Sequence, residues 1–498
     1  MQKSLDIGVI GAGYASLATA CYLAHAGHRV TMYEKNEMIG GRSRQLKAEG
    51  FTFDMGPTWY WMPDVFERFF NDLGRSSSDY YELIRTDPAY RVYFGEGDYM
   101  DMPTSLEALY ALFEQEEKGA GKVLRQFLKE AEDNYDIAIK DLVYRPGLSP
   151  LELITPQTIK KVGLFFKTIS KDVRARFKSE RLRSILEFPV LFLGAKPSKT
   201  PAFYNFMNYA DMVLGTWHPR GGMFSVVQGM QKVAEELGIQ VKTSADVTAI
   251  HTDQGKATGL EVNGAFCPHD VVVSGADYAH TETLLKKDER KYSKTYWEKR
   301  TFAPSALLFY LGLDTKIEKA LHHTLFFDTS FEEHAKAIYD NPKWPDRPLF
   351  YASFPSKTDS YLAPEGCETG IFLIPIAPGI EDGEAIREEY YEILLSRLKA
   401  LTGQELKDHV VYKRSYCVSD FVKDYNSYKG NAYGLANTLL QTAFLRPSIV
   451  SKKVKDLYFT GQLTVPGPGV PPSLISGKIV ADKIIEENTK SVRYAAAL

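Results

Sequence analysis

The first forty residues place a strand, a glycine-rich turn, a helix and a second strand in close succession. An apolar run from Ile7 to Ile10 predicts a strand, and Gly11-Ala12-Gly13 follows it directly. A helix of small residues is expected from about Ser16 to Gly27, and a second strand from Arg29 to Tyr33. This order predicts a β-α-β unit that binds a dinucleotide, with the pyrophosphate at the N-terminus of the helix.

Glu34 ends the second strand, 21 residues after Gly13, where it can accept a hydrogen bond from a ribose hydroxyl. Its charge would repel a 2′-phosphate, which leaves FAD and NAD as candidate ligands. The third glycine of the usual pattern is replaced by Ser16, which is small enough for close packing of helix on strand. The alternative is a glycine turn without a ligand, and the surrounding strand, helix and acid argue against it.

Gly40-Gly41-Arg42 comes just behind this unit and favours FAD over NAD. A nicotinamide site does not require such a pair of glycines. The arrangement resembles the flavoprotein superfamily that includes amine oxidases and carotenoid desaturases, in which these residues wrap FAD. A tight turn with a solvated arginine is the alternative.

Length and composition set limits on the class of protein. The chain has 498 residues, enough for two or three domains, and 44% hydrophobic and 25% charged residues, as expected for a folded chain. A net charge of −3 gives no indication of nucleic-acid binding. Four separated cysteines without a C-x-x-C pair predict no disulfide framework and no metal site, and they suit a reducing cytoplasm. We expect neither a signal peptide nor a spanning helix.

Residues 156–183 form a basic segment with helical periodicity. Apolar residues at 159, 162, 166, 169 and 173 form one stripe, and nine Lys or Arg against two acids lie between 160 and 183. A basic amphipathic helix with phenylalanine on its apolar face suits a membrane surface. The alternative is a solvated helix packed on the protein by its stripe.

Two further segments are candidates for ligand contact. Trp59, Tyr60 and Trp61 follow a predicted turn, and they either form a domain interface or line a large apolar site. Near the C-terminus, a strand from Leu457 to Thr460 precedes a turn, 461–472, with three Gly and four Pro, and then a helix from Ser473. This second strand-turn-helix is interpreted as the other half of a cofactor site.

These motifs together resemble the bacterial-type phytoene desaturase family of FAD-dependent carotenoid desaturases, most closely the enzymes of carotenoid-making Bacteroidetes. The chain departs from the family at Ser16 and at 462–465, where many members read Ala-Gly-Thr-His. The matching residues run nearly from end to end: Gly11-Ala12-Gly13, Glu34, Gly40-Gly41-Arg42, 54–58, 216–217, 219–222, 275–277, 355–366, 430–435 and 461–471.

The resemblance implies an α/β fold with a Rossmann-like FAD-binding domain that is discontinuous in sequence. Residues 1–90, 217–290 and 450–490 would form that domain. Residues 91–216 would form a helical, membrane-associating subdomain with part of the substrate domain, and residues 291–449 a mixed-sheet substrate-binding domain.

The resemblance also assigns roles to residues. Gly11, Gly13 and Ser16 would hold the pyrophosphate and Glu34 the adenosine ribose, while the backbone of Val247 would contact the adenine. Gly41, Arg42, Gly56, Pro57 and Thr58 would wrap the ribityl and flavin region, and Gly461, Gly469 and Val470 would close over the isoalloxazine. Candidates for the substrate lining are Trp59, Tyr60, Trp61 and Trp217. The catalytic base is not identified; His218 and Arg220 are candidates, and a structural role for His218 is the alternative.

The implied reaction is desaturation of a carotenoid, foremost phytoene, by hydride transfer to flavin and loss of a proton. Substrate would be drawn from the membrane by an enzyme bound peripherally to its inner, cytoplasmic face, and electrons would pass to a quinone or to oxygen. The number of desaturation steps and the oligomeric state are not predicted. Alternatives are a 3,4-desaturase, a C30 diapophytoene desaturase, a carotenoid isomerase, an amine-oxidase-like enzyme and a non-catalytic prenyl-binding protein.

Overall fold

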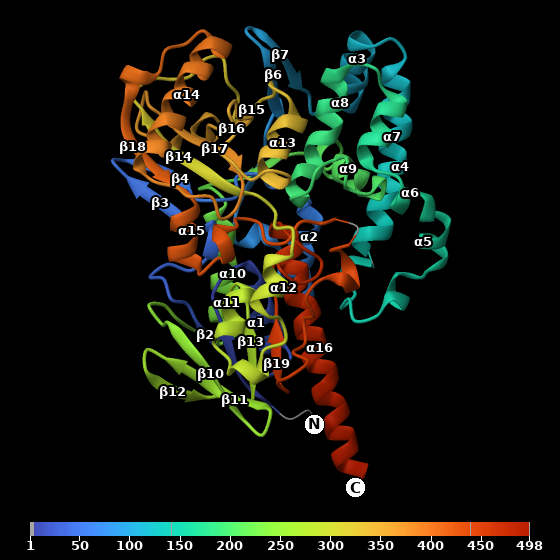
Figure 1. Cartoon of the computed structure of the whole chain (residues 1–498), viewed down its shortest axis with the longest axis vertical. Helices are drawn as coiled ribbons and strands as arrows, with labels where there is room; N and C mark the ends of the chain where they lie inside the picture. The colour runs from blue at the N-terminus through green and yellow to red at the C-terminus, as the bar shows by residue number, and fades with distance from the viewer. Residues whose placement is uncertain (1–3, 141, 439, 498) are drawn as a thin grey trace.

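A five-stranded parallel sheet forms the lower half of the molecule (Figure 1). The computed structural model describes residues 4–140, 142–438 and 440–497. The strand order is β19 (Leu457–Phe459), β13 (Val271–Ser274), β1 (Asp6–Ile10), β2 (Arg29–Tyr33) and β9 (Gln240–Lys242). Its strands come from three distant stretches of the chain, which confirms the predicted discontinuous Rossmann-like domain.

Helices α1 (Tyr14–His25) and α16 (Val470–Ala497) pack against each other beside this sheet. They approach closely because Gly477 has no side chain: a Cβ there would lie 2.6 Å from the Ala15 carbonyl oxygen. Helix α10 (Phe224–Glu236) also contacts α1. An antiparallel sheet of β10 (Val247–Asp253), β11 (Lys256–Val262) and β12 (Ala265–Pro268) extends from this half of the molecule.

A seven-stranded sheet forms the upper half (Figure 1). Its pairs are antiparallel except β15 with β6, so the sheet is mixed, as predicted. Helices α13 (Phe331–Tyr339) and α14 (Glu384–Thr402) accompany it. The strand order is β18 (Val410–Tyr416), β14 (Ser305–Leu313), β17 (Glu368–Ile376), β16 (Phe350–Ser353), β15 (His323–Phe326), β6 (Tyr90–Gly95) and β7 (Asp98–Met102).

A group of helices lies to one side of both sheets (Figure 1). Its members are α3 (Leu106–Glu116), α4 (Ala120–Lys140), α5 (Pro156–Lys160), α6 (Val162–Phe166), α7 (Ile169–Arg176), α8 (Glu180–Glu187) and α9 (Phe206–Met212). Two short pairs of strands and one helix connect the parts. They are β3 (Gln45–Ala48) with β4 (Phe51–Asp54), β5 (Leu83–Arg85) with β8 (Trp217–Pro219), and α2 (Pro63–Asp72).

The predicted single amphipathic helix over 159–173 is wrong. The chain turns at Lys161 and again at Lys167, whose extended backbone (ψ 141°) ends α6, and Thr168 caps α7. Three short helices result. Ile169 and Val173 are buried in the core, whereas Ile159 and Phe166 are exposed, so the stripe is divided between two environments.

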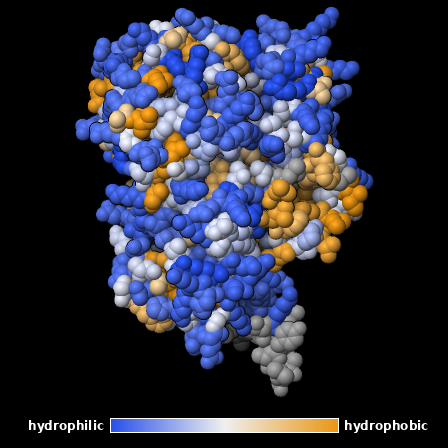
Figure 2. All heavy atoms as spheres, viewed as in Figure 1, coloured by the Kyte–Doolittle hydropathy of each residue, from blue (hydrophilic) through white to orange (hydrophobic). Residues whose placement is uncertain are grey.

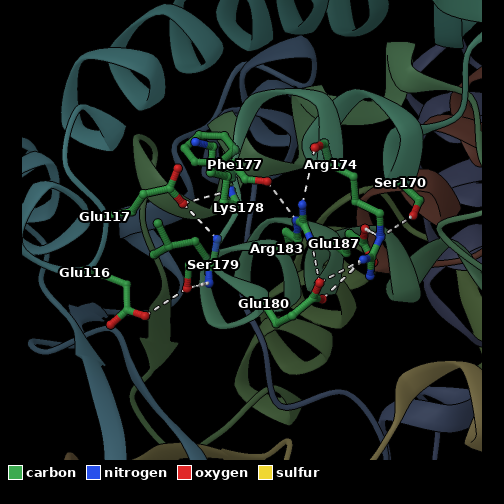
Figure 3. Close-up of polar contacts among 11 residues, drawn as sticks. Glu116, Glu117, Ser170, Arg174, Phe177, Lys178, Ser179, Glu180, Arg183 and Glu187 are labelled. Atoms are coloured by element: carbon green, nitrogen blue, oxygen red, sulfur yellow. Dashed lines mark hydrogen bonds and ion pairs between the residues drawn. The ribbon is translucent and has the colours of Figure 1, made fainter.

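Part of the positive charge of this segment is also neutralised, because five of its nine cations form ion pairs: Lys167, Arg174, Arg176, Arg181 and Arg183. Arg174 and Arg183 both pair with Glu180 (Figure 3). Acids outside the segment contribute as well: Glu130 of α4 pairs with Arg176. Glu117, which caps the C-terminal end of α3, accepts hydrogen bonds from the backbone N–H groups of residues 178 and 179 (Figure 3). Folding therefore brings in acids from about 50 residues away in sequence, which the local count of two could not include.

Candidate functional site

A cavity of about 460 Å³ lies between the parallel sheet and the seven-stranded sheet, and segments from the whole length of the chain line it. All thirteen residues predicted to bind the cofactor reach its wall: Gly11, Gly13, Ser16, Glu34, Gly41, Arg42, Gly56, Pro57, Thr58, Val247, Gly461, Gly469 and Val470. Residues separated by more than 400 positions thus meet in one site.

The end of the cavity near β1 is built from closely packed backbone. Gly13 is the N-cap of α1, and a Cβ on Gly41 would lie 3.3 Å from the Gly13 Cα atom. The Glu34 carboxylate accepts hydrogen bonds from the backbone N–H groups of Ala12 (2.9 Å) and Asn36 (3.0 Å). A helix N-terminus in such a cradle, with a buried acid beside it, suits a pyrophosphate and an adjoining ribose.

Ser16 replaces the third glycine of the motif at no cost to the packing, because Gly275 makes room for it. A Cβ on Gly275 would lie 2.0 Å from the Ser16 Oγ atom, so the two positions cannot both carry side chains. The Ser16 side chain is buried beside the strand end and its hydroxyl contacts the Ile10 carbonyl oxygen at 3.4 Å.

Arg42 is a half-buried cation on the cavity wall. Its guanidinium donates to the Ser427 hydroxyl (3.2 Å) and the Asn431 carbonyl (3.1 Å), and burial lowers its pKa. Its Nε has no hydrogen-bond partner among the described residues. The Arg42 carbonyl leaves room only for glycine at position 56, since a Cβ there would lie 2.2 Å from that oxygen. A donor without a partner beside a glycine cradle fits the polar part of FAD.

Arg446 holds the glycine- and proline-rich turn at the other side of the cavity. It is buried, and its guanidinium donates to the carbonyl oxygens of Thr464 (2.6 Å), Gln462 (2.7 Å) and Gln441 (3.0 Å). Burial lowers its pKa to about 10. The sequence analysis missed this residue, because a lone arginine before a strand carries no motif.

The upper part of the cavity is an apolar arm lined by aromatic side chains. Trp59 and Trp61 belong to it as predicted, and both pack against Phe188 and Phe192. Phe327, Phe331, Ile338, Leu349, Phe350 and Leu373 continue the lining. The phenylalanines of 188–193 were missed because they lie in a short 3₁₀ helix whose apolar run carries no sign of a ligand site.

Tyr60 and Trp217 lie outside the residues that line the cavity, contrary to expectation. Tyr60 is fully buried, stacks on Phe66 and shares a hydrogen bond of 2.8 Å with the Tyr81 hydroxyl. The strand-like alternation of side chains explains the difference, because it turns Trp59 and Trp61 to one side and Tyr60 to the other.

Neither candidate base reaches the cavity. Arg220 is half exposed and pairs with Glu82 at 2.8 Å. His218 is buried, 3.8 Å from the Asp359 carboxylate, and its ring lies against that of His322 with centroids 4.8 Å apart. Two adjacent histidines at the start of β15 were the one signal in the sequence for this cluster, and the sequence analysis did not use it.

Comparison with known proteins gives consistent results. The family model described as "Flavin containing amine oxidoreductase" matches residues 15–485. A carotenoid 3,4-desaturase of Haloarcula japonica is 43% identical over 97% of this chain and 98% of its own. A 4,4′-diapophytoene desaturase of Staphylococcus haemolyticus is 33% identical over 97% and 99%. Among solved structures, an oxidoreductase from Methanosarcina mazei covers 96% of this chain and 99% of its own, with a TM-score of 0.62 and 18% identity.

Proposed function

Because the chain belongs to the flavin-containing amine oxidoreductases, and among them to the FAD-dependent carotenoid desaturases, we propose that it desaturates phytoene. The observation that supports a long hydrocarbon substrate is the apolar arm, which continues directly from the cofactor residues. A polar amine would find few partners among the aromatic side chains there. A 3,4-desaturation and a C30 substrate remain the second candidates, since the two desaturase relatives carry those activities in their names.

The chain's own residues would bind FAD along one edge of the cavity. The turn at Gly11 and Gly13 would hold the pyrophosphate, Glu34 the ribose, and Arg42 with Gly56 the middle of the cofactor. When bound, FAD supplies the acceptor for a hydride. The aromatic arm would then align the polyene and exclude water, and the half-buried Trp59 and the buried Trp61 would form the wall next to the reacting carbons.

The test of this proposal is pigment formation in cells that make one defined precursor. Three host strains would supply phytoene, 4,4′-diapophytoene or lycopene, and extracts would be compared with and without the chain. New double bonds in the phytoene strain, seen as a red shift of the absorption bands, are expected. Colourless phytoene beside folded, yellow flavoprotein would contradict the proposal, and products only in one of the other strains would assign the substrate to that alternative.

We further propose that the protein docks on a membrane by an apolar patch rather than by one basic helix. The patch consists of Leu148, Leu151, Ile154, Ile159, Phe166, Leu440 and Leu445, all exposed. The orange area on the right of Figure 2 lies over α5 and α6. Lys160 is exposed beside Ile159 and can contact anionic headgroups.

One segment of the chain runs from the cavity wall toward the patch. Residues 196–202 run from Lys196 on the cavity wall to the segment before α7, where backbone hydrogen bonds join Ala202 to Lys167 (2.7 Å) and Ile169 to Thr200 (2.9 Å). A substrate leaving the lipid would thus meet the arm close to the docking surface. None of the helices in the described ranges is both long and apolar enough to span a membrane.

Vesicle flotation tests this surface. Leu151 and Phe166 are 72% and 81% exposed, and burying two such side chains in lipid contributes about 2–5 kcal/mol. We expect L151E/F166E to lower the partition coefficient at least about 30-fold. Phe266→Glu is the matched control, because Phe266 is 54% exposed on β12. Unchanged flotation of a folded L151E/F166E protein would contradict the proposed surface.

The electrons would pass from reduced FAD to a quinone or to oxygen. Reoxidation of the reduced protein by a soluble quinone under argon, compared with air, distinguishes these acceptors. A protein that reoxidises with neither would contradict this part of the proposal. Binding at the cytoplasmic face of the membrane is proposed together with the docking surface.

A further inference from the structure

Three histidines and a tyrosine form a buried cluster directly behind the wall of the apolar arm. Tyr351 lines the cavity, and its hydroxyl lies 2.6 Å from the Nδ1 atom of His323 and 2.8 Å from the Thr58 hydroxyl. The His323 ring stacks on Trp59 with centroids 4.0 Å apart and an interplanar angle of 14°. The cluster therefore touches both the predicted cofactor wall and the substrate wall.

The cluster continues away from the cavity in one direction. The ring centroids of His323 and His322 are 4.2 Å apart, and those of His322 and His218 are 4.8 Å apart. The His218 Nε2 atom lies 3.8 Å from an oxygen of the Asp359 carboxylate. The Nδ1 atom of His322 shares a hydrogen bond of 2.7 Å with the hydroxyl of Thr358, which is half-buried. The row of rings ends at the surface turn 355–362.

Ordinary packing does not account for the ring nitrogens of this cluster. The Nε2 atoms of His218, His322 and His323 are all buried, and none has a hydrogen-bond partner among the described residues. Three such atoms in one cluster are costly unless they have a use or hold water. Within the ranges that the structure describes, no three ligating side chains are placed to hold a metal ion.

Burial also keeps the two adjacent histidines uncharged. The pKa values of His322 and His323 lie well below the usual 6.5, because burial disfavours the cation and neighbouring histidine rings add repulsion. A neutral imidazole has one N–H donor and one free acceptor nitrogen, so it can take a proton on one side and release one on the other. Asp359, held by the Gly221 N–H group at 2.7 Å, is the buried carboxylate at the outer end.

We propose that Tyr351, His323, His322 and His218 form a chain that carries the proton released in each desaturation from the cavity to Asp359. The inference rests on the proposed function, which supplies the need for it: a new C=C bond requires loss of a hydride from one carbon and of a proton from the next. FAD is the oxidant that accepts the hydride. The proton has to leave the apolar arm, and the carboxylates among the described lining residues all come from other segments than its aromatic side chains: Glu34, Asp246, Asp277 and Asp424.

The step balances as follows in atoms and electrons. The two electrons of the second C–H bond become the new π bond, and its proton is taken by the Tyr351 oxygen. The proton that Tyr351 gives up passes to the free Nδ1 atom of His323, and His323 releases the proton on its Nε2 toward His322. His322 passes a proton on to His218, and His218 delivers one to the buried Asp359 carboxylate, from which the proton leaves to water through the turn 355–362. The transfers between rings run directly or through a buried water.

Removing one hydroxyl at the inner end tests the chain. Tyr351→Phe keeps the ring in the wall, and Tyr390→Phe is the matched control, because Tyr390 is buried with one hydrogen bond of 2.6 Å to the Pro345 carbonyl, remote from the cavity. We expect Y351F to lower kcat at least ten-fold with unchanged FAD content, and Y390F to leave kcat within two-fold of wild type. His322 does not line the cavity. His322→Gln should therefore lower kcat with little change in KM, and it should abolish the solvent isotope effect on kcat.

A second measurement does not depend on turnover. In protein labelled with ¹⁵N in the histidine rings, Y351F should move the resonances of His323 and also those of His322 and His218, while Y390F should move none of them. Shifts confined to His323 would overturn the proposal. So would equal kcat values for Y351F, H322Q and Y390F, provided that the wild-type protein is active. If the wild type desaturates none of the three precursors, the proposed function fails, and the resonance shifts alone decide whether the cluster is a coupled chain.

Discussion

Adding one methyl group at Gly56 should disturb FAD binding without touching any charged group. The Cβ atom of Gly56→Ala would lie 2.2 Å from the Arg42 carbonyl oxygen, and Cβ atoms essentially never come closer than 3.0 Å to another heavy atom. One of the two segments must therefore move by about 0.8 Å. The Arg42 side chain is anchored to Ser427 and Asn431, so the movement strains the turn at residues 40–42.

The magnitude follows from the usual energy of overpacking, about 1–3 kcal/mol. In the free protein the turn can shift and release this strain. Binding of FAD requires the original position, so the strain returns in the complex. The dissociation constant for FAD should rise about 5- to 150-fold.

The assay is titration of deflavinated protein with FAD, followed by quenching of flavin fluorescence. Gly163→Ala is the control: the same methyl group is added within α6, where nothing lies within 4 Å of the new atom, and helix propensity favours alanine. G163A should bind FAD as the wild type does. A folded G56A protein whose dissociation constant stays within about two-fold of wild type would refute the argument that this contact fixes the turn.

Three further predictions concern other parts of the site. Glu34→Ala removes the acceptor of the Ala12 N–H group and the predicted ribose contact, and should weaken FAD binding by about 2–4 kcal/mol, measured by the same titration. Arg446→Met leaves the Gln462 carbonyl and its neighbours without a donor, and should lower both the melting temperature and the flavin content after purification. Burial lowers the pKa of His334 to about 4, so below pH 6.5 the unfolded chain takes up a proton at this residue while the folded protein keeps it neutral. The free energy of unfolding should therefore fall by up to about 3 kcal/mol between pH 6.5 and 4. The urea midpoint, measured against pH, should fall less steeply in H334Q than in the wild type.

The cofactor half of the site could be predicted from sequence because its requirements are local. Gly11, Gly13 and Gly41 stand where backbone must approach backbone, and the spacing from Gly13 to Glu34 is fixed by one helix and one strand. The compensating pair of Ser16 and Gly275 needed the structure, because the two residues lie about 260 positions apart and share one small space, and so did Arg446, which no motif marks.

The basic segment was misjudged because charge is not a local property of a folded chain. Nine cations in 24 residues looked like a surplus, but Glu130 of α4 and Glu116 of α3 lie against Arg176 and Arg181. The predicted apolar stripe correctly included Phe166 as a residue that faces solvent. It is exposed because it ends the short helix α6 just before Lys167, and it is not part of one long helix.

Most of the aromatic arm could not be predicted, because no local rule governs it: Trp59 and Trp61 were expected to line a ligand site, but their partners in the wall were not. Its wall takes Trp59 from a loop, Phe188 from a 3₁₀ helix and Tyr351 from an interior strand, and these positions share only the tertiary fold. The same difference between local and tertiary requirements separates FAD binding from the choice of carotenoid substrate. We expect FAD binding to depend on the backbone geometry at the glycines and on the Glu34 and Arg42 side chains near them, whereas the choice among carotenoids depends on how far the aromatic arm extends. Variants at residues that line the cavity away from the predicted cofactor residues in sequence, such as Phe331 and Tyr339, should therefore change which precursor is desaturated while leaving the flavin content unchanged.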